Sequence, residues 1–424
     1  MAIRVVPFSF SAAGIDAIGL RAAAAGFLSV IEDGGCVSNQ KSIATMLIHD
    51  AYRPPAGFAA LQPAVHRAST VLFDSVAALR SRNWQDKTAY TYGLHGTPTS
   101  FTLEARLAAI EDGKHCILAP SGLAAIAMIN LALLKSGDDV LLPDNVYNPN
   151  RDMANWLARE FGISARYYDP LLGAGIDALM RPQTRLVWTE APGSVSMEVP
   201  DVPAICRVAH AHGALVAIDN TWSAGLAFAA FPHGVDVVMQ ALTKYQSGGS
   251  DVLMGAVITR DSALNRRLEE VHMRLGFGVG MDDAYLVLRS LPSMAVRFAA
   301  HDRGARAVAA WLRQRPEIHA VLHPAFPDCP GHSIWQRDFT GAGGLFSVIF
   351  DARYSEQQTD RLVDALQLFG IGFSWGGAHS LCVPYRIAAM RRDWQQPGQL
   401  LRFNIGLEDP ADLIADIEQA LALL

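Results

Sequence analysis

The chain has 424 residues, of which half are hydrophobic and 18% are charged, and its formal net charge is −6. A chain of this length can form two or three packed units, and the composition is typical of compact globular proteins rather than disordered or fibrous ones. The negative net charge gives no overall attraction to nucleic-acid phosphates or anionic membranes. The composition therefore argues against nucleic acid and membrane as partners.

The five cysteines are scattered, odd in number and form no CxxC pair, which argues against a disulfide framework and a zinc ribbon. A reduced, cytoplasmic compartment is the simplest interpretation. His210 and His212 lie two residues apart but lack the cysteine or carboxylate neighbours of a metal site. We therefore predict no bound metal.

Residues 1–42 contain Arg4, Arg21, only three acidic residues and the tract RAAAAGFLSVI. This composition has some features of a targeting peptide, but the apolar parts are interrupted and no clear cleavage site follows. We predict an extension that packs loosely or stays disordered, and whose deletion leaves assembly and activity largely intact.

From about residue 100, helical and strand patterns alternate along the chain. Amphipathic or apolar helical segments are predicted at 99–113, 121–138, 150–162 and 202–213. Short apolar strands are predicted at 115–120, 139–144, 163–169, 184–192, 214–222 and 235–245. Continuous apolar strands separated by helices indicate an α/β fold, in which a mostly parallel sheet is covered on both faces.

One window in this region, residues 116–134, contains no charged side chain and is long enough to imitate a membrane span. It is interrupted by Pro120 and Asn130, and no second window resembles it. We predict a helix buried in the α/β core.

The pattern changes after about residue 290. A long helix at 294–315 is followed by a strand at 344–351, a helix at 355–370 and a strand at 400–409. This order predicts a smaller C-terminal α+β domain, residues 291–424, packed on the α/β domain, residues 101–290.

The most informative polar residue is Lys244, which follows the apolar run VDVVMQAL. Ligands of such sheets gather at the carboxyl ends of strands, where the strand pattern also places Asp219 and the start of a helix at Ser121. A helix N-terminus binds phosphate, a carboxylate pairs with a protonated ring nitrogen, and a lysine amine forms a Schiff base with an aldehyde. Together these groups point to pyridoxal phosphate.

The motifs around these residues resemble the cysteine/methionine-metabolism family of pyridoxal-phosphate enzymes. The similar segments are TMLIH, TYGLHGTPT, PGSVSMEVPDVPAI, IDNTWSAG, TKYQSGGSD, HPAFPDCPGHSIWQRDFTGAGGLFS, FSWGG and LLRFNIGLEDPADLIADI. They occur in this order across residues 45–424, nearly the whole chain. The resemblance implies the aminotransferase-like fold type I, with a mostly parallel seven-stranded sheet, and a homotetramer built from dimers with shared active sites.

The resemblance also implies the residues that hold the cofactor. Lys244 is the Schiff-base lysine and the acid/base that moves the α-proton, and Asp219 pairs with the ring nitrogen. Tyr147 stacks on the ring. The phosphate is held by Gly122, Leu123 and Thr243.

On the substrate side, the resemblance implies that Arg402 binds the α-carboxylate and that Ser374 and Trp375 line the same pocket. Tyr92, on an N-terminal arm formed by residues 43–100, reaches the active site of a neighbouring subunit. Lys244, Tyr147 and Tyr92 are therefore the expected catalytic residues.

The implied reaction is β-elimination of L-cystathionine and related cysteine thioethers to a thiol, pyruvate and ammonia. Other members of the family, namely γ-lyases, γ-synthases and sulfhydrylases, remain alternatives, as does a regulator that keeps the fold without catalysis. FSWGG and PGSVSMEV favour the β-lyase.

Two positions depart from the family pattern. Leu94 stands where the family usually has a phosphate-binding arginine, and Ala241 stands where a serine often precedes the lysine. His95 is a candidate replacement for the arginine, and phosphate binding is expected to use fewer groups than usual.

Overall fold

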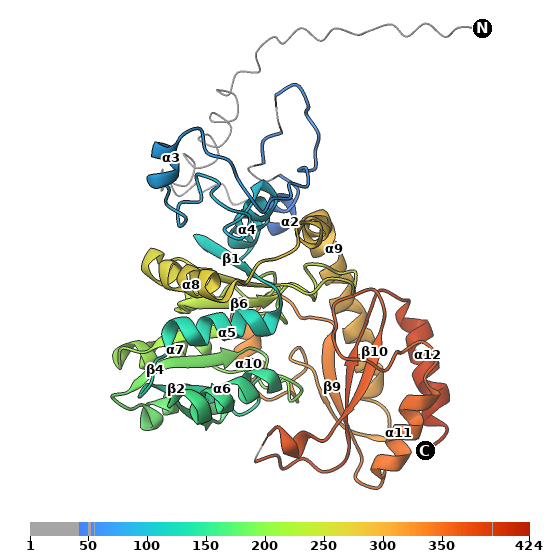
Figure 1. Ribbon diagram of the computed structural model, residues 1–424. Coiled ribbons are helices and arrows are strands. Elements are labelled where there is room, and N and C mark those ends of the chain that lie inside the picture. Colours follow the sequence, from blue (N-terminus) through green and yellow to red (C-terminus); the bar gives the residue numbers. More distant parts are fainter. Residues whose placement is uncertain (1–41, 50–51, 55, 392) are drawn as a thin grey trace, which may run out of the picture.

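The computed structural model describes residues 42–49, 52–54, 56–391 and 393–424. The predicted extension lies outside them except for Ser42, which caps α2 (Ile43–Met46). Figure 1 shows two lobes side by side, with residues 42–100 above the larger lobe. This N-terminal arm contains α2 and α3 (Val76–Arg80) and is otherwise mostly irregular.

The larger lobe is built on a seven-stranded sheet with the strand order β1-β7-β6-β5-β4-β2-β3. Its strands are β1 (His115–Ala119), β2 (Asp139–Pro143), β3 (Ser164–Tyr168), β4 (Thr184–Glu190), β5 (Leu215–Asp219), β6 (Val237–Ala241) and β7 (Gly255–Thr259). β7 runs antiparallel to both of its neighbours, β1 and β6, and the other pairs are parallel. The predicted mostly parallel sheet is confirmed.

Helices cover both faces of this sheet (Figure 1). They are α4 (Pro98–Ile110), α5 (Gly122–Leu133), α6 (Asn148–Phe161), α7 (Val202–Ala211) and α8 (Ser262–Leu275), with short 3₁₀ helices η1 (Pro170–Leu179) and η2 (Phe231–His233). Side chains of the strands alternate between two cores. In β1, for example, Cys116 and Leu118 pack on the α4 and α7 side, whereas Ile117 and Ala119 pack on the α5 and α8 side.

The uncharged window 116–134 forms β1 and the buried helix α5 inside this lobe, as the sequence predicts. Ala125, Ile126, Met128 and Ile129 in α5 are fully buried. In the part of the chain that the structure describes, no helix combines the length and apolar character needed to cross a membrane.

The smaller lobe contains an antiparallel four-stranded sheet with the order β10-β11-β9-β8. Its strands are β8 (Ile318–Leu322), β9 (Leu345–Phe350), β10 (Leu381–Tyr385) and β11 (Leu400–Asn404). Its helices are α9 (Met281–Leu312), α10 (His332–Asp338), α11 (Glu356–Ala365), α12 (Pro410–Leu421) and η3 (Ile387–Ala389). A separate apolar core joins this sheet to α9, α11 and α12. The smaller α+β unit is therefore as predicted, and the boundary expected at 290/291 falls inside α9.

Candidate active site

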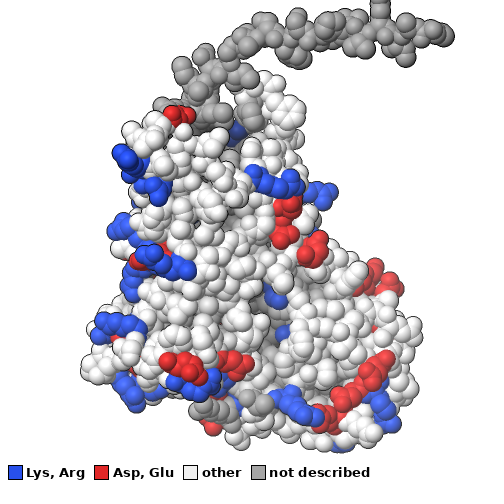
Figure 2. All heavy atoms as spheres, viewed as in Figure 1, with Lys and Arg blue, Asp and Glu red and all other residues white. Residues whose placement is uncertain are grey.

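The site lies where parallel strands of the large sheet end and face the small lobe. β4 ends at Glu190, β5 ends at Asp219, and the turn after β6 carries Lys244. The carboxyl ends of parallel strands meet at one edge of a sheet, which is where ligands of open α/β sheets bind. Figure 2 shows that the surface is hollowed between the two lobes and that basic side chains lie in the hollow.

Lys244 is held by the small lobe. Its Nζ donates a hydrogen bond of 2.9 Å to Ser374 Oγ and lies 5.4 Å from the centroid of the Trp375 ring. Burial, helped by the charge of Arg402, lowers the pKa of Lys244 from 10.5 to about 8, whereas the charge of Asp219 opposes the change. Because a substantial fraction of the amine is then neutral near pH 8, Lys244 is suited to act as a nucleophile and as a base.

Asp219 has an acidic neighbour that the sequence analysis did not single out. Glu190 on β4 is the register partner of Asp219 on β5. Burial raises the pKa of both carboxyl groups, and the charge of Asp219 raises that of Glu190 further. Glu190 accepts hydrogen bonds from the Tyr147 N–H (2.7 Å) and from Ser194 Oγ (2.6 Å), and Asp219 accepts one from the Thr221 N–H (3.0 Å). Glu190 lies near the end of the strand predicted at 184–192 and is the last residue of β4, so the argument that identified Asp219 applies to it as well.

Tyr147 immediately precedes α6, and the residue is 42% exposed beside these carboxylates. Burial raises the pKa of its hydroxyl, and the charges of Asp219 and Glu190 raise it further. The backbone is fixed through Glu190 while the ring is accessible, so the ring can stack on a flat ligand.

The start of α5 forms a close-fitting cradle at the end of β1. Ser121 Oγ accepts a hydrogen bond from the Ala124 N–H (3.0 Å), while the first N–H groups of any helix, here those of Gly122 and Leu123, have no partner within the helix. A Cβ added to Gly122 would lie 2.8 Å from the Ala241 Cβ, so the helix start lies directly against the end of β6. Thr243 is two residues further along, and its Oγ1 contacts Met254.

Arg402 on β11 supplies a second cation from the small lobe. Its guanidinium lies 5.0 Å from the centroid of the Tyr385 ring. Burial raises the pKa of the Tyr385 hydroxyl, while the charge of Arg402 lowers it. Tyr385 ends β10, a strand that the sequence analysis did not identify, so no signal pointed to it.

Ser374 and Trp375 belong to a tight loop that packs against the end of β6. Ser374 has a φ of 104°, which is strained for a residue other than glycine and is tolerated where the surroundings hold it. Gly376 has a φ of 79°, and an added Cβ would lie 2.9 Å from the Tyr245 backbone nitrogen. Only glycine therefore allows this loop to bring Ser374 to Lys244.

Tyr92 is not brought to this pocket within one chain. Its backbone bridges to Thr70, its ring lies 6.1 Å from the His95 ring, and the residue is 47% exposed. His95 contacts Thr91 and Trp84, and Leu94 lies near Gly278. The described contacts of Tyr92, Leu94 and His95 thus lie around the arm and the start of α9, and not at Lys244.

Pyridoxal phosphate carries an aldehyde, a ring nitrogen and a phosphate, and the pocket offers a suitable group to each of them. Lys244 offers the amine, Asp219 the carboxylate and the α5 cradle the N–H groups. The residues present therefore fit this cofactor. The α/β fold and this pocket define a pyridoxal-phosphate-dependent enzyme.

Comparison with known proteins identifies the family. Residues 44–422 match the family described as Cys/Met metabolism PLP-dependent enzyme, and the chain belongs to it. The chain is 41% identical over 397 residues to a putative cystathionine beta-lyase of Rhizobium johnstonii, covering 92% of this chain and 99% of that protein. It is 42% identical over 395 residues to a cystathionine beta-lyase of Bordetella avium, covering 91% and 98%.

A solved structure agrees with this assignment. The crystal structure of metB from Corynebacterium glutamicum superposes with a TM-score of 0.83 at 28% sequence identity, covering 91% of this chain and 98% of that chain. The predicted family, fold and pyridoxal-phosphate cofactor are thus confirmed.

Proposed function

We propose that the protein catalyses β-elimination of L-cystathionine and related cysteine thioethers, which with water yields a thiol, pyruvate and ammonia. The observation that carries this proposal is the Lys244 amine, whose pKa of about 8 and contact with Ser374 place a usable base beside Asp219. The names of the two lyase relatives support cystathionine as the substrate.

When bound, pyridoxal phosphate supplies the electron sink that stabilises negative charge at the substrate Cα. Asp219 would hold the proton of the ring nitrogen, and the exposed Tyr147 would stack on the ring. Gly122, Leu123 and Thr243 would bind the phosphate.

The small lobe orients the substrate. The planar guanidinium of Arg402 suits the α-carboxylate, because it can donate two parallel hydrogen bonds. Lys244 Nζ accepts the proton from Cα, and the Cβ–S bond then breaks with departure of the thiolate. Ser374 and Trp375 contact Lys244 and would line the same pocket as the substrate.

Product analysis tests the proposal, because γ-elimination requires a further proton transfer at Cβ that β-elimination does not. Purified protein given cystathionine should produce pyruvate and homocysteine, with little 2-oxobutyrate and cysteine, and chromatography of the keto acids separates the two pathways. Predominant 2-oxobutyrate would show a γ-lyase instead. A protein that binds the cofactor but releases neither keto acid would favour the regulator.

The same proposal includes a cytoplasmic homotetramer in which Tyr92 completes the site of a neighbouring subunit. Its support is the half-exposed position of Tyr92 on the arm, among contacts that do not include the Lys244 pocket.

Four cysteines are free and buried in the described part of the chain, which suits a reducing compartment. The division into an arm (43–100) and domains (101–290 and 291–424) remains part of the proposal.

A further inference from the structure

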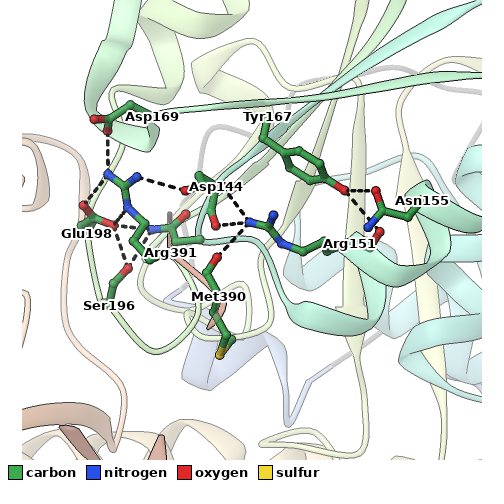
Figure 3. Close-up of polar contacts among 10 residues, drawn as sticks. Asp144, Arg151, Asn155, Tyr167, Asp169, Ser196, Glu198, Met390 and Arg391 are labelled. Carbon is green, nitrogen blue, oxygen red and sulfur yellow. Dashed lines mark hydrogen bonds and ion pairs between the residues drawn. The ribbon is translucent and has the colours of Figure 1, made fainter. Parts of the chain in front are cut away.

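A buried guanidinium connects the small lobe to the strand ends next to the site (Figure 3). Arg391 is 6% exposed and lies in the connection between β10 and β11. Its partners are three carboxylates of the large lobe. Nη1 lies 3.3 Å from Asp144 Oδ2, and Nη2 lies 3.2 Å from Asp169 Oδ1. Glu198 is bound twice, from Nε to Oε2 and from Nη2 to Oε1, each at 3.2 Å.

The three carboxylates follow three different strands. Asp144 comes directly after β2, Asp169 directly after β3, and Glu198 lies in the loop after β4. Asp144 and Glu198 are buried, whereas the Asp169 side chain is half exposed. Arg391 therefore fixes the relative positions of the ends of β2 and β3 and of the loop after β4, at the edge of the sheet where the candidate site lies.

A second guanidinium holds the same segment from the other side. Arg151 on α6 donates from Nη2 to Asp144 Oδ1 (2.8 Å), to the Asp144 carbonyl oxygen and to the Met390 carbonyl oxygen (2.9 Å). Figure 3 shows Asp144 between the two arginines. Asp144, which begins the β2–α6 connection, is thus bound to Arg391 of the small lobe through its side chain. It is also linked to the small lobe through Arg151, which binds both Asp144 and the Met390 carbonyl oxygen.

The next residue, Asn145, ties this connection to the loop after β4. Its Nδ2 donates to Ser196 Oγ (3.0 Å) and to Glu198 Oε2 (2.9 Å), and Ser196 Oγ donates to the same Glu198 oxygen (2.7 Å). A Cβ on Gly193 would lie 2.0 Å from Asn145 Nδ2, so the amide packs directly on that backbone. Tyr147 follows two residues later.

We propose that Arg391 is a positioning residue that sets the place of the Tyr147 ring and makes it depend on the docking of the small lobe. The inference deepens the proposed function and rests on it for the role of Tyr147. Arg402 and Ser374 belong to the same lobe as Arg391. The contact network therefore couples the groups expected to bind the substrate to the ring expected to stack on the cofactor.

The geometry requires arginine at this position. A guanidinium offers five N–H donors in a rigid plane and can serve three carboxylates at once, whereas an ammonium on a flexible stem cannot match the paired contact with Glu198. The substitution Arg391→Lys keeps the charge and removes the planar fork. Buried carboxylates without their partners favour rearrangement of the segment that carries them.

The test compares Arg391→Lys with Arg386→Lys in the purified holoenzyme. Arg386 lies in the same connection, but its side chain is 82% exposed, and it pairs with Glu356 at the surface at 2.7 Å. Arg391→Lys should retain one cofactor per subunit, lose about ten-fold or more in kcat with a smaller change in KM, and show a weaker visible circular dichroism band of the bound cofactor. A displacement of about 1 Å near reacting groups can cost about 100-fold in rate. Arg386→Lys should match the unmodified enzyme in each measurement.

A double-mutant cycle tests whether Arg391 acts through Tyr147. In a Tyr147→Ala background, Arg391→Lys should change kcat by less than about two-fold, because non-additivity marks residues that act together. Equal losses in both backgrounds would overturn the proposal, as would an unchanged kcat and dichroism band in Arg391→Lys. The dichroism comparison needs no cystathionine cleavage, so failure of the proposed function gives a different result.

If Arg391→Lys does not fold, Asp169→Asn provides the second measurement, because it weakens one half-exposed contact and leaves the buried pairs in place. A smaller loss of kcat and of the dichroism band, in the same direction, supports the proposal. No change in either quantity overturns it.

Discussion

At the scale of single residues, the proposed chemistry depends on Lys244. Replacement of Lys244 by Ala should abolish the visible absorption of the lysine-bound cofactor and nearly all elimination activity, because no other amine is described in the pocket. Lys135→Ala is the matched control, since Lys135 is exposed in the loop after α5. Absorption spectra and keto-acid release are the measurements. A yellow, active Lys244→Ala protein would disprove the assignment.

The lowered pKa of Lys244 predicts how cofactor uptake depends on pH. The folded-state pKa is about 8 rather than 10.5, so the neutral, nucleophilic fraction of the amine rises as the pH rises through 8. The rate at which the cofactor-free protein regains its visible absorption should increase up to about pH 8 and then level off. A rate that continues to rise towards pH 10.5 would show that the amine is solvated and unperturbed.

The lowered pKa of Lys244 also determines how this residue changes the free energy of unfolding of the cofactor-free protein. The charged amine is disfavoured by burial, so its cost is fully present below pH 8 and fades as the pH rises from 8 to 10.5. Denaturant unfolding of the cofactor-free protein should therefore show a gain in this window that Lys244→Ala lacks. Both proteins share all other titratable groups, so the difference between their stabilities isolates the contribution of Lys244.

At the scale of elements, the FSWGG loop depends on glycine. Gly376→Ala combines a φ of 79° with a Cβ placed 2.9 Å from the Tyr245 backbone nitrogen, whereas Gly213→Ala has a similar φ of 72° and nothing within 4 Å. The control should lose about 1–2 kcal/mol of unfolding free energy from the left-handed conformation alone. Gly376→Ala should lose more and should also lose activity, because Ser374 and Trp375 move. Denaturant titration and rate assays measure both. Equal stability losses would contradict the close packing.

Some elements of the fold can be predicted from the sequence, and others cannot. β2, β3, β4 and β5 are continuous apolar runs between helices, and their positions follow from periodicity and turn residues. β7 and β10 are not evident from the local pattern. β7 pairs antiparallel with β6, which precedes it directly, and also with β1, which lies far away in the chain, whereas β10 pairs with β11, the next strand. Glu190 follows the rule that identified Asp219, whereas Tyr385 depends on the unrecognised strand β10.

At the scale of the whole molecule, the position of Tyr92 predicts shared active sites. Tyr92→Ala and Lys244→Ala should each be nearly inactive as separate proteins. When the two are dissociated together and reassembled in equal amounts, about one quarter of the unmodified activity should return, because half of the dimers are mixed and each mixed dimer has one intact site. Rate assays and sedimentation measure activity and assembly. No recovery in correctly assembled mixtures would place Tyr92 outside the neighbouring site.

The sequence by itself determined the α/β class and predicted Lys244 and Asp219 as the residues that hold the cofactor. These follow from local periodicity, from the high cost of a charged side chain at the end of an apolar strand and from motifs that resemble one family. Only the tertiary structure decided what surrounds them. Ser374 against Lys244, Glu190 beside Asp219, and Arg391 among three carboxylates join residues 29 to 247 positions apart in the chain. The Glu190–Asp219 contact depends on the pairing of β4 with β5, and the other two depend on how the two lobes pack. No local pattern specifies either.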